Sequence, residues 1–233
     1  QILQRGPLLN MLTKFESFMR QIGLWVGFVL AVAAIYGAGP FPFIEQGVRL
    51  GGAIGSAVII TLMLKPLANE FGGESPNRRM FFWVIDLIIL FGFLFTLLNF
   101  AEVYESLWDG VVILETPTLA IGFFGTMVII DMVRRNFGII LPIICILMLI
   151  YAQFGDLPGI FGHRGFTFEE VVEVSWFSFG GVFGRPTDIV SSIVLVFIVF
   201  GAFLEATGAT TILLKMATVA TARVRGGTAH SAI

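Results

Sequence analysis

The sequence predicts an all-α, polytopic membrane protein with about six transmembrane helices, an external interfacial helix and a cytoplasmic amphipathic helix. Of the 233 side chains, 57% are apolar and 13% are charged, about half the charge content of a soluble protein. The apolar side chains form long runs. The 27 glycines and 9 prolines fit transmembrane helices, which tolerate both residues. This composition excludes a water-soluble monomer and a disordered chain.

A transmembrane helix needs roughly 20 mostly apolar residues, and the chain contains six runs near that length. No signal peptide is expected, because the polar lead of residues 1–20 is too long and contains Glu16. The first run should therefore stay in the membrane. The six runs cover residues 22–38, 48–64, 80–100, 119–133, 137–154 and 189–204.

Proline and glycine support these limits. The Gly-Pro-Phe-Pro sequence at 39–42 ends the first run, and Thr116 with Pro117 provides a cap and a first-turn proline for the fourth. Pro142 falls inside the fifth run, where it removes a backbone donor, so we expect a kink near Gly138.

The basic residues set the expected orientation, because Lys and Arg resist translocation. If the chain crosses six times, 11 of its 14 basic residues fall on one side, which is then cytoplasmic together with both chain ends. The acidic loops lie outside with three basic residues, Arg49, Arg164 and Arg185. The 11 are Arg5, Lys14, Arg20, Lys65, Arg78, Arg79, Arg134, Arg135, Lys215, Arg223 and Arg225.

Two further segments are predicted to form helices that do not cross the membrane. Thr167 and Glu170 form a capping box, and with two more glutamates in the next turns this helix should lie at the external interface and stop at Gly180–Gly181. From Thr210 to about Arg225, basic and threonine side chains recur at helical spacing among apolar ones. This pattern predicts an amphipathic arm on the cytoplasmic surface, with Lys215, Arg223 and Arg225 as its basic residues.

Three acidic residues in or next to the runs are candidate functional charges, because a charge inside the bilayer usually has a partner or a task. Asp131 lies one turn before Arg134 and Arg135, which favours an ion pair on one helix face over a functional role. Asp86 lies about two turns from Arg79, so it either reaches the interface or a donor on a neighbouring helix, or lies on an ion or proton pathway.

Glu205 closes the sixth run at a helix C-terminus, where the helix dipole disfavours an anion. Lys215 or Arg223 would compensate it, and this pairing is favoured over a role in transport.

Several functional classes find no support in the sequence, so we do not expect an enzyme. A membrane haem needs ligands within the bundle, but the two histidines, His163 and His230, lie in an external loop and near the chain end. The single cysteine, Cys145, lies inside an apolar run, so no disulfide scaffold or cysteine metal site is expected. The glycine-rich segment at 51–55 is not followed by the Lys-Ser or Lys-Thr of a nucleotide-binding loop. Its pair Gly51 and Gly55 is better explained by close packing of helices. The basic residues form no nucleic-acid stripe.

The second half of the chain resembles a known family. The segment 154–170 reads FGDLPGIFGHRGFTFEE, and the segment 181–227 reads GVFGRPTDIVSSIVLVFIVFGAFLEATGATTILLKMATVATARVRGG. These residues resemble the fused permease of TRAP transporters, the tripartite ATP-independent periplasmic transporters, and among them the TAXI type. The resemblance covers residues 137–233, with GAFLE at 201–205 and RGG at 225–227 the most specific pieces. The first four runs match the small four-helix subunit only in number and layout.

The resemblance implies a sodium-coupled permease of the bacterial or archaeal inner membrane that imports organic acids such as dicarboxylates. It implies an extracytoplasmic substrate-binding protein as partner and an elevator-like movement. Residues 1–133 would then correspond to the small subunit, and residues 134–233 to the start of the large one. Family members hold sodium and substrate in re-entrant hairpins, which these residues do not reach. No cofactor besides the sodium ion is implied, and no ligand residue is assigned.

We also expect the chain to be part of a longer polypeptide, because it begins with Gln1 and residues 228–233 open an apolar segment without completing it. Its partners would then include the rest of the large subunit and the bilayer. Two alternatives stay open: a membrane scaffold or assembly subunit without transport activity, and a membrane enzyme or electron-transfer anchor. Intramembrane histidine pairs would favour the anchor, and the sequence has none.

Overall fold

The computed structural model describes residues 7–39, 45–73, 75–109, 115–155 and 162–221. Within these ranges the chain is helical and contains no strand, which confirms the all-α class. The helices are α1 (Pro7–Gly37), α2 (Gln46–Leu64), α3 (Leu67–Phe71), α4 (Pro76–Asp109), α5 (Thr116–Phe137), α6 (Ile140–Gln153), α7 (Phe168–Trp176), α8 (Arg185–Ile189), the π-helix η2 (Val190–Val194), α9 (Leu195–Ala206) and α10 (Ala209–Thr221).

Five helical stretches among the described residues are long and apolar enough to cross a membrane. They coincide with the first, second, third, fourth and sixth predicted runs. The protein is therefore a multi-pass membrane protein, as its composition indicates. The five stretches are Asn10–Gly37, Gln46–Phe71, Pro76–Tyr104, Thr116–Phe137 and Arg185–Ala206.

The fifth predicted span, residues 137–154, is shorter than expected. Its helix, α6, has 14 residues and is therefore about 21 Å long, less than the roughly 30 Å of a bilayer core. Gly138, at φ +80°, ends α5 in the left-handed region that favours glycine, so the chain breaks where a kink was expected. Pro142 then lies in the first turn of α6, where its missing N–H disrupts no helical hydrogen bond.

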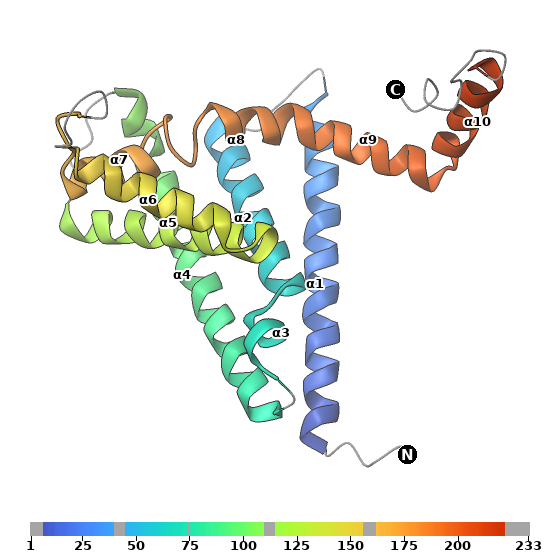
Figure 1. The fold of residues 1–233 in the computed structure, drawn as a ribbon, viewed down its shortest axis with the longest axis horizontal. Coiled ribbons are helices and arrows are strands. Elements are labelled where there is room, and N and C mark those ends of the chain that lie inside the picture. The colour runs from blue at the N-terminus through green and yellow to red at the C-terminus, as the bar shows by residue number, and fades with distance from the viewer. Residues whose placement is uncertain (1–6, 40–44, 74, 110–114, 156–161, 222–233) are drawn as a thin grey trace.

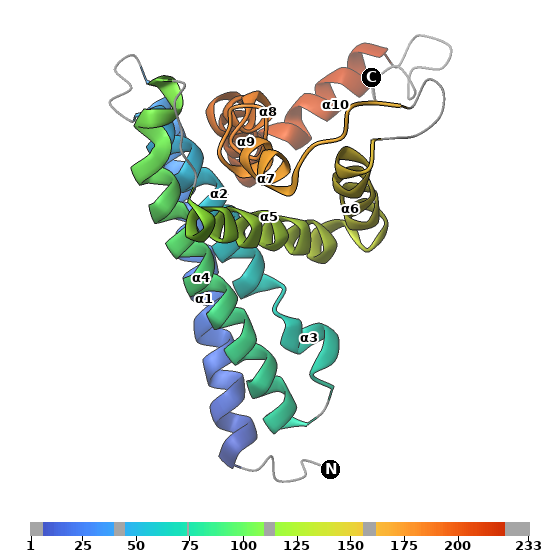
Figure 2. The same cartoon turned by 90° about the vertical axis from the view of Figure 1, so that its left-hand side faces the viewer.

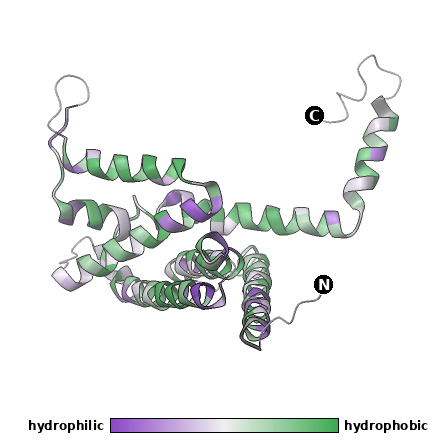
Figure 3. Ribbon diagram, turned by 60° about the horizontal axis from the view of Figure 1, so that its bottom comes forward, coloured by the Kyte–Doolittle hydropathy of each residue, from purple (hydrophilic) through white to green (hydrophobic). Residues whose placement is uncertain are grey.

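The helices form two differently oriented groups (Figures 1 and 2). α1, α2 and α4 run side by side, and α2 contacts both of the others. α5, α6 and α9 run across this group, and α5 packs on α4. α9 extends away from the core and carries α10 at its far end (Figure 1). Apolar residues line α6 and α9 along their length (Figure 3), and most of their side chains are exposed.

Aromatic rings from α4 and from the segment beginning in α7 form the centre of the core. Trp176 and Phe183 are buried, Trp176 contacts Phe93 edge to face, and Phe183 stacks on Phe100. α7, which was expected at the external interface, packs on α5, and Trp176 at its end contacts Phe93 of α4. A glycine on α5 makes the space: a Cβ at Gly125 would lie 2.5 Å from the Trp176 ring.

The start of α7 follows the sequence prediction, and its end does not. The side-chain hydroxyl of Thr167 accepts from the Glu170 N–H, and the Glu170 carboxylate accepts from the Thr167 N–H, which completes the capping box. The helix ends at Trp176, before the expected Gly180–Gly181 stop. The chain then turns so tightly that a Cβ at Gly181 would lie 2.1 Å from the Ser175 carbonyl oxygen.

Acidification should release the cap of α7. The Thr167 backbone N–H, then its hydroxyl and Arg164, hold the pKa of Glu170 below its ordinary value, outweighing the opposing effect of burial. A carboxyl with a lowered pKa stabilises the fold above its ordinary pKa and loses this contribution as pH falls through the lowered pKa. We expect hydrogen exchange of the α7 amides, corrected for intrinsic rates, to accelerate across this window in the parent. In the Glu170→Gln variant the exchange should not change with pH, and an equal change in both proteins would contradict the assignment.

α9 ends at Ala206, and Gly208, at φ +73°, separates it from α10. α10 confirms a helix over the first part of the predicted arm, and its Lys215 is exposed. Arg223 and Arg225 lie outside the described residues. The division of the chain at residue 133 stays a prediction; α5 continues through this position to Phe137.

Candidate functional site

A buried ion pair joins two spans that are far apart in sequence. Asp86 on α4 and Arg135 at the end of α5 are 2.7 Å apart, Arg135 Nη2 donating to Asp86 Oδ1. Their side chains are 0% and 1% exposed. The other oxygen of Asp86 accepts from the Leu67 N–H at the start of α3, also at 2.7 Å. One carboxylate thus connects α3, α4 and α5.

Arg135 also makes contacts beyond Asp86. Its Nε donates to Asp131 one turn earlier, at 2.7 Å, and its Nη1 donates to the Lys65 carbonyl oxygen at the end of α2, at 3.2 Å. Asp131 accepts from Arg134 as well, at 2.9 Å, so the ion pairs expected for Asp131 on one helix face are confirmed. Arg134 in turn binds both carboxylate oxygens of Glu70 on α3, at 2.6 and 2.7 Å.

The resulting network is electrically balanced. It contains three carboxylates and three basic side chains. Lys65 belongs to it through its carbonyl oxygen, which accepts from Arg135, while its ammonium group donates to the Asn136 side chain at 3.0 Å. Buried charges cost several kcal/mol each unless opposite charges and hydrogen bonds compensate them, and here every arginine has at least two acceptors. We call this set the α5 network. Its members are Lys65, Glu70, Asp86, Asp131, Arg134 and Arg135.

A second cluster fixes α1 to α4. Glu16 Oε1 accepts from Arg79 at two nitrogens, 2.7 and 3.0 Å away, and from the Trp83 indole at 3.4 Å. Arg79 also donates to the Asn69 side-chain oxygen on α3, at 3.1 Å. Phe15 packs edge to face on Trp83 beside these bonds. α3 is therefore bound by two clusters, the α5 network through Leu67 and Glu70, and the Glu16–Arg79 cluster through Asn69.

The two candidate aspartates come together on one guanidinium, which sequence spacing alone did not indicate. Asp86 was expected to reach the interface or a donor on a neighbouring helix, and it accepts from Arg135 on α5, 49 residues away. The nearby Arg79 binds Glu16 instead. Short-range spacing finds pairs such as Asp131 with Arg134; a pair between distant helices depends on how those helices pack.

The third candidate charge, Glu205, is exposed at the end of α9. Neither it nor Lys215 forms an ion pair with another described residue. Arg223, the other expected partner, lies outside the described ranges. No group of three or more metal-ligating side chains occurs in the described part of the chain.

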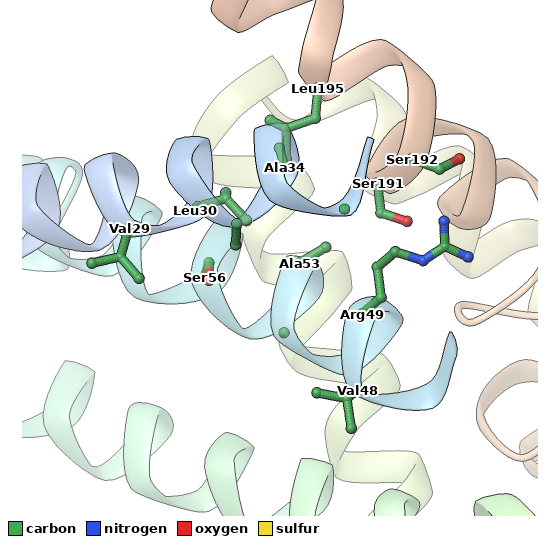
Figure 4. A pocket seen from close by; sticks show the side chains of 13 residues that line it. Val29, Leu30, Ala34, Val48, Arg49, Ala53, Ser56, Ser191, Ser192 and Leu195 are labelled. Atoms are coloured by element: carbon green, nitrogen blue, oxygen red, sulfur yellow. The ribbon is translucent and has the colours of Figure 1, made fainter. Parts of the chain in front are cut away.

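A pocket of about 260 Å³ lies where η2 and the start of α9 meet α1 and α2 (Figure 4). Arg49 of α2 points toward Ser191 and Ser192 of η2, and it forms an ion pair with Asp188 at 2.5 Å. Both serine hydroxyls donate to the Asp188 carbonyl oxygen, at 3.1 and 2.6 Å. The rest of the lining consists mainly of small and aliphatic residues of α1 and α2.

The π-helix η2 interrupts the α8–α9 span at this pocket. Such insertions are rare and frequently lie at functional sites. The Arg49–Asp188 pair is part-exposed, 28% and 32%, and is the one ion pair between α2 and the α8–α9 span among the described residues. The span is thus attached to the core through one charged contact and packing with α1 and α2.

The ion pairs join helices that are distant in sequence. Among the described residues, ion pairs link α1, α3, α4 and α5 to one another, and one ion pair links the α8–α9 span to α2. Comparisons with models of protein families, with curated proteins and with solved structures find no match to this chain.

Proposed function

We propose that this chain forms the stationary part, and the first segment of the moving part, of a sodium-coupled permease for organic acids such as dicarboxylates. The observation that carries the proposal is the contrast between the two groups of helices. The α5 network and the Glu16–Arg79 pair lock α1, α3, α4 and α5 together. The α8–α9–α10 segment has one ion pair to this core.

A transporter of alternating access needs such a contrast, because one group of helices moves against another around the bound solute. Strong charge pairs suit the fixed group, since moving them would expose uncompensated charge to lipid. A part-exposed ion pair beside a π-helix suits a joint between the groups, because its contribution to stability is small.

The resemblance of residues 137–233 to TRAP permeases supplies the finer parts of the proposal. Sodium is the coupling ion, and an extracytoplasmic binding protein delivers the substrate to the acidic side near α7. The amphipathic helix α10 is an arm at the cytoplasmic face that leads from α9 toward the rest of the moving part. The protein lies in the inner membrane with its N-terminus in the cytoplasm, and ion and substrate bind in parts of the permease beyond these 233 residues.

The experiment is uptake by the full-length protein in proteoliposomes, with its binding protein and labelled organic acids. We expect uptake that requires an inward sodium gradient and the binding protein, and no uptake when potassium replaces sodium. A chain consisting of residues 1–233 alone should take up nothing. If the full-length protein takes up none of the acids in a sodium-dependent way, the proposal is contradicted and an assembly subunit is favoured.

A further inference from the structure

A polar pocket lies between α1, the α2–α3 turn and α4, away from the α8–α9 span. Its volume is about 550 Å³, and five of its nine lining residues are polar or charged. These are Thr13, Glu16, Ser17 and Arg20 from α1, and Asn69 from α3. Arg79, which binds Glu16 and Asn69, does not itself line the pocket.

Three side chains in this pocket have donors for which no bond to a described residue is found, those of Ser17, Arg20 and Asn69. The Asn69 side-chain oxygen accepts from Arg79, which leaves its amide nitrogen as a donor. Neither this nitrogen nor the Ser17 hydroxyl has a hydrogen-bond partner among the described residues. Arg20 is exposed and forms no ion pair with a described residue.

Two charged side chains line the pocket, those of Glu16 and Arg20. Glu16 Oε1 is engaged by two nitrogens of Arg79 and by the Trp83 indole. Glu16 and Arg79 therefore balance each other, and Arg20 remains as an unneutralised guanidinium. A guanidinium with neighbouring amide and hydroxyl donors matches the oxygens of a phosphate group.

The position of the pocket along the membrane helices also points to phosphate. α4 changes from polar to apolar between Arg79 and Met80, and the run that starts there continues to residue 100. Glu16 and Asn69 both bind Arg79, so the pocket lies level with this change. The same level in a bilayer is the headgroup region that borders the hydrocarbon core.

We propose that this pocket binds a phosphate group through Arg20, Ser17 and the Asn69 amide. The group belongs either to a phospholipid headgroup or to a soluble phosphate compound, which present the same oxygens to these donors. The inference does not depend on the permease proposal, because no substrate or sodium site is involved.

The test measures binding to the purified full chain in lipid-free detergent. Inorganic phosphate and a water-soluble short-chain phosphatidylglycerol are titrated separately at constant ionic strength, with chloride as the matched salt, and the midpoint of thermal unfolding is followed. We expect at least one ligand to raise the midpoint in a saturable way. Saturation by phosphatidylglycerol at much lower concentration assigns the site to lipid, and equal saturation by phosphate assigns it to a soluble compound.

Arg20→Gln should weaken this binding about tenfold or more, because it removes a charge-assisted hydrogen bond. Arg78→Gln is the matched control: Arg78 is also exposed and unpaired among the described residues, but it does not line the pocket. It lies five residues from Trp83, about 140° around α4. Ser17→Ala should weaken binding by a smaller factor, and decides the question if the Arg20 variant does not fold. The absence of saturable binding, or equal losses in the Arg20 and Arg78 variants, would overturn the proposal.

Discussion

Replacing Arg135 with methionine should lower the free energy of unfolding by about 3–5 kcal/mol, because it leaves a buried carboxylate without its partner. Asp86 is fully buried, and Arg135 is the one cation within hydrogen-bond distance of it among the described residues. The loss should appear in unfolding by denaturant in mixed micelles, followed by tryptophan fluorescence.

The matched control removes both charges. Asp86→Leu combined with Arg135→Met should recover most of the lost stability, because no buried charge then remains unpaired and the apolar side chains fill the same space. The recovery should be incomplete, since the Leu67 N–H loses its acceptor. A double variant as unstable as the Arg135 single variant would show that packing, and not charge compensation, accounts for the effect.

Truncation of the Trp176 side chain should lower the free energy of unfolding about as much as loss of the Asp86–Arg135 ion pair. Its ring is fully buried against Phe93 and Phe183 and fills the space above Gly125. Trp176→Ala should therefore cost about 3–5 kcal/mol, the range for deleting a buried aromatic ring. Unfolding by denaturant, followed by the fluorescence of the three remaining tryptophans, measures this loss.

Trp176→Phe is the control for the polar part of the side chain. The indole nitrogen is buried and has no hydrogen-bond partner among the described residues. Replacing it loses no hydrogen bond, so this variant should cost at most about 1.5 kcal/mol. A loss as large as that of the alanine variant would indicate that the indole N–H has a partner, such as a buried water.

The features that the sequence predicted well are local ones. Apolar runs indicate spans because each helix satisfies its own backbone in lipid. The Thr167–Glu170 capping box and the Asp131–Arg134 pair lie within one turn, so the spacing alone identifies them. The predicted length of the fifth span was wrong, because a count of apolar residues does not detect that Gly138 takes a positive φ and separates α5 from α6.

The features that could not be predicted depend on packing between distant segments. Asp86 and Arg135 meet because α5 crosses α4 near their ends, and no periodicity in either helix encodes that crossing. The burial of Trp176 depends on the space left by Gly125, 51 residues earlier, and nothing in the sequence indicates that these two residues meet. The polar pocket at Arg20 likewise needs three elements in place before its donors converge.

Cysteine labelling of intact cells tests the central claim, a multi-pass chain with 11 of its 14 basic residues at the cytoplasmic face, most directly. In a background where Cys145 is replaced by serine, single cysteines at the exposed positions Arg78 and Glu173 are treated with a membrane-impermeant maleimide. The account predicts that the cysteine at 173 is labelled in intact cells and the one at 78 only after permeabilisation. Labelling at 78 from outside would contradict it.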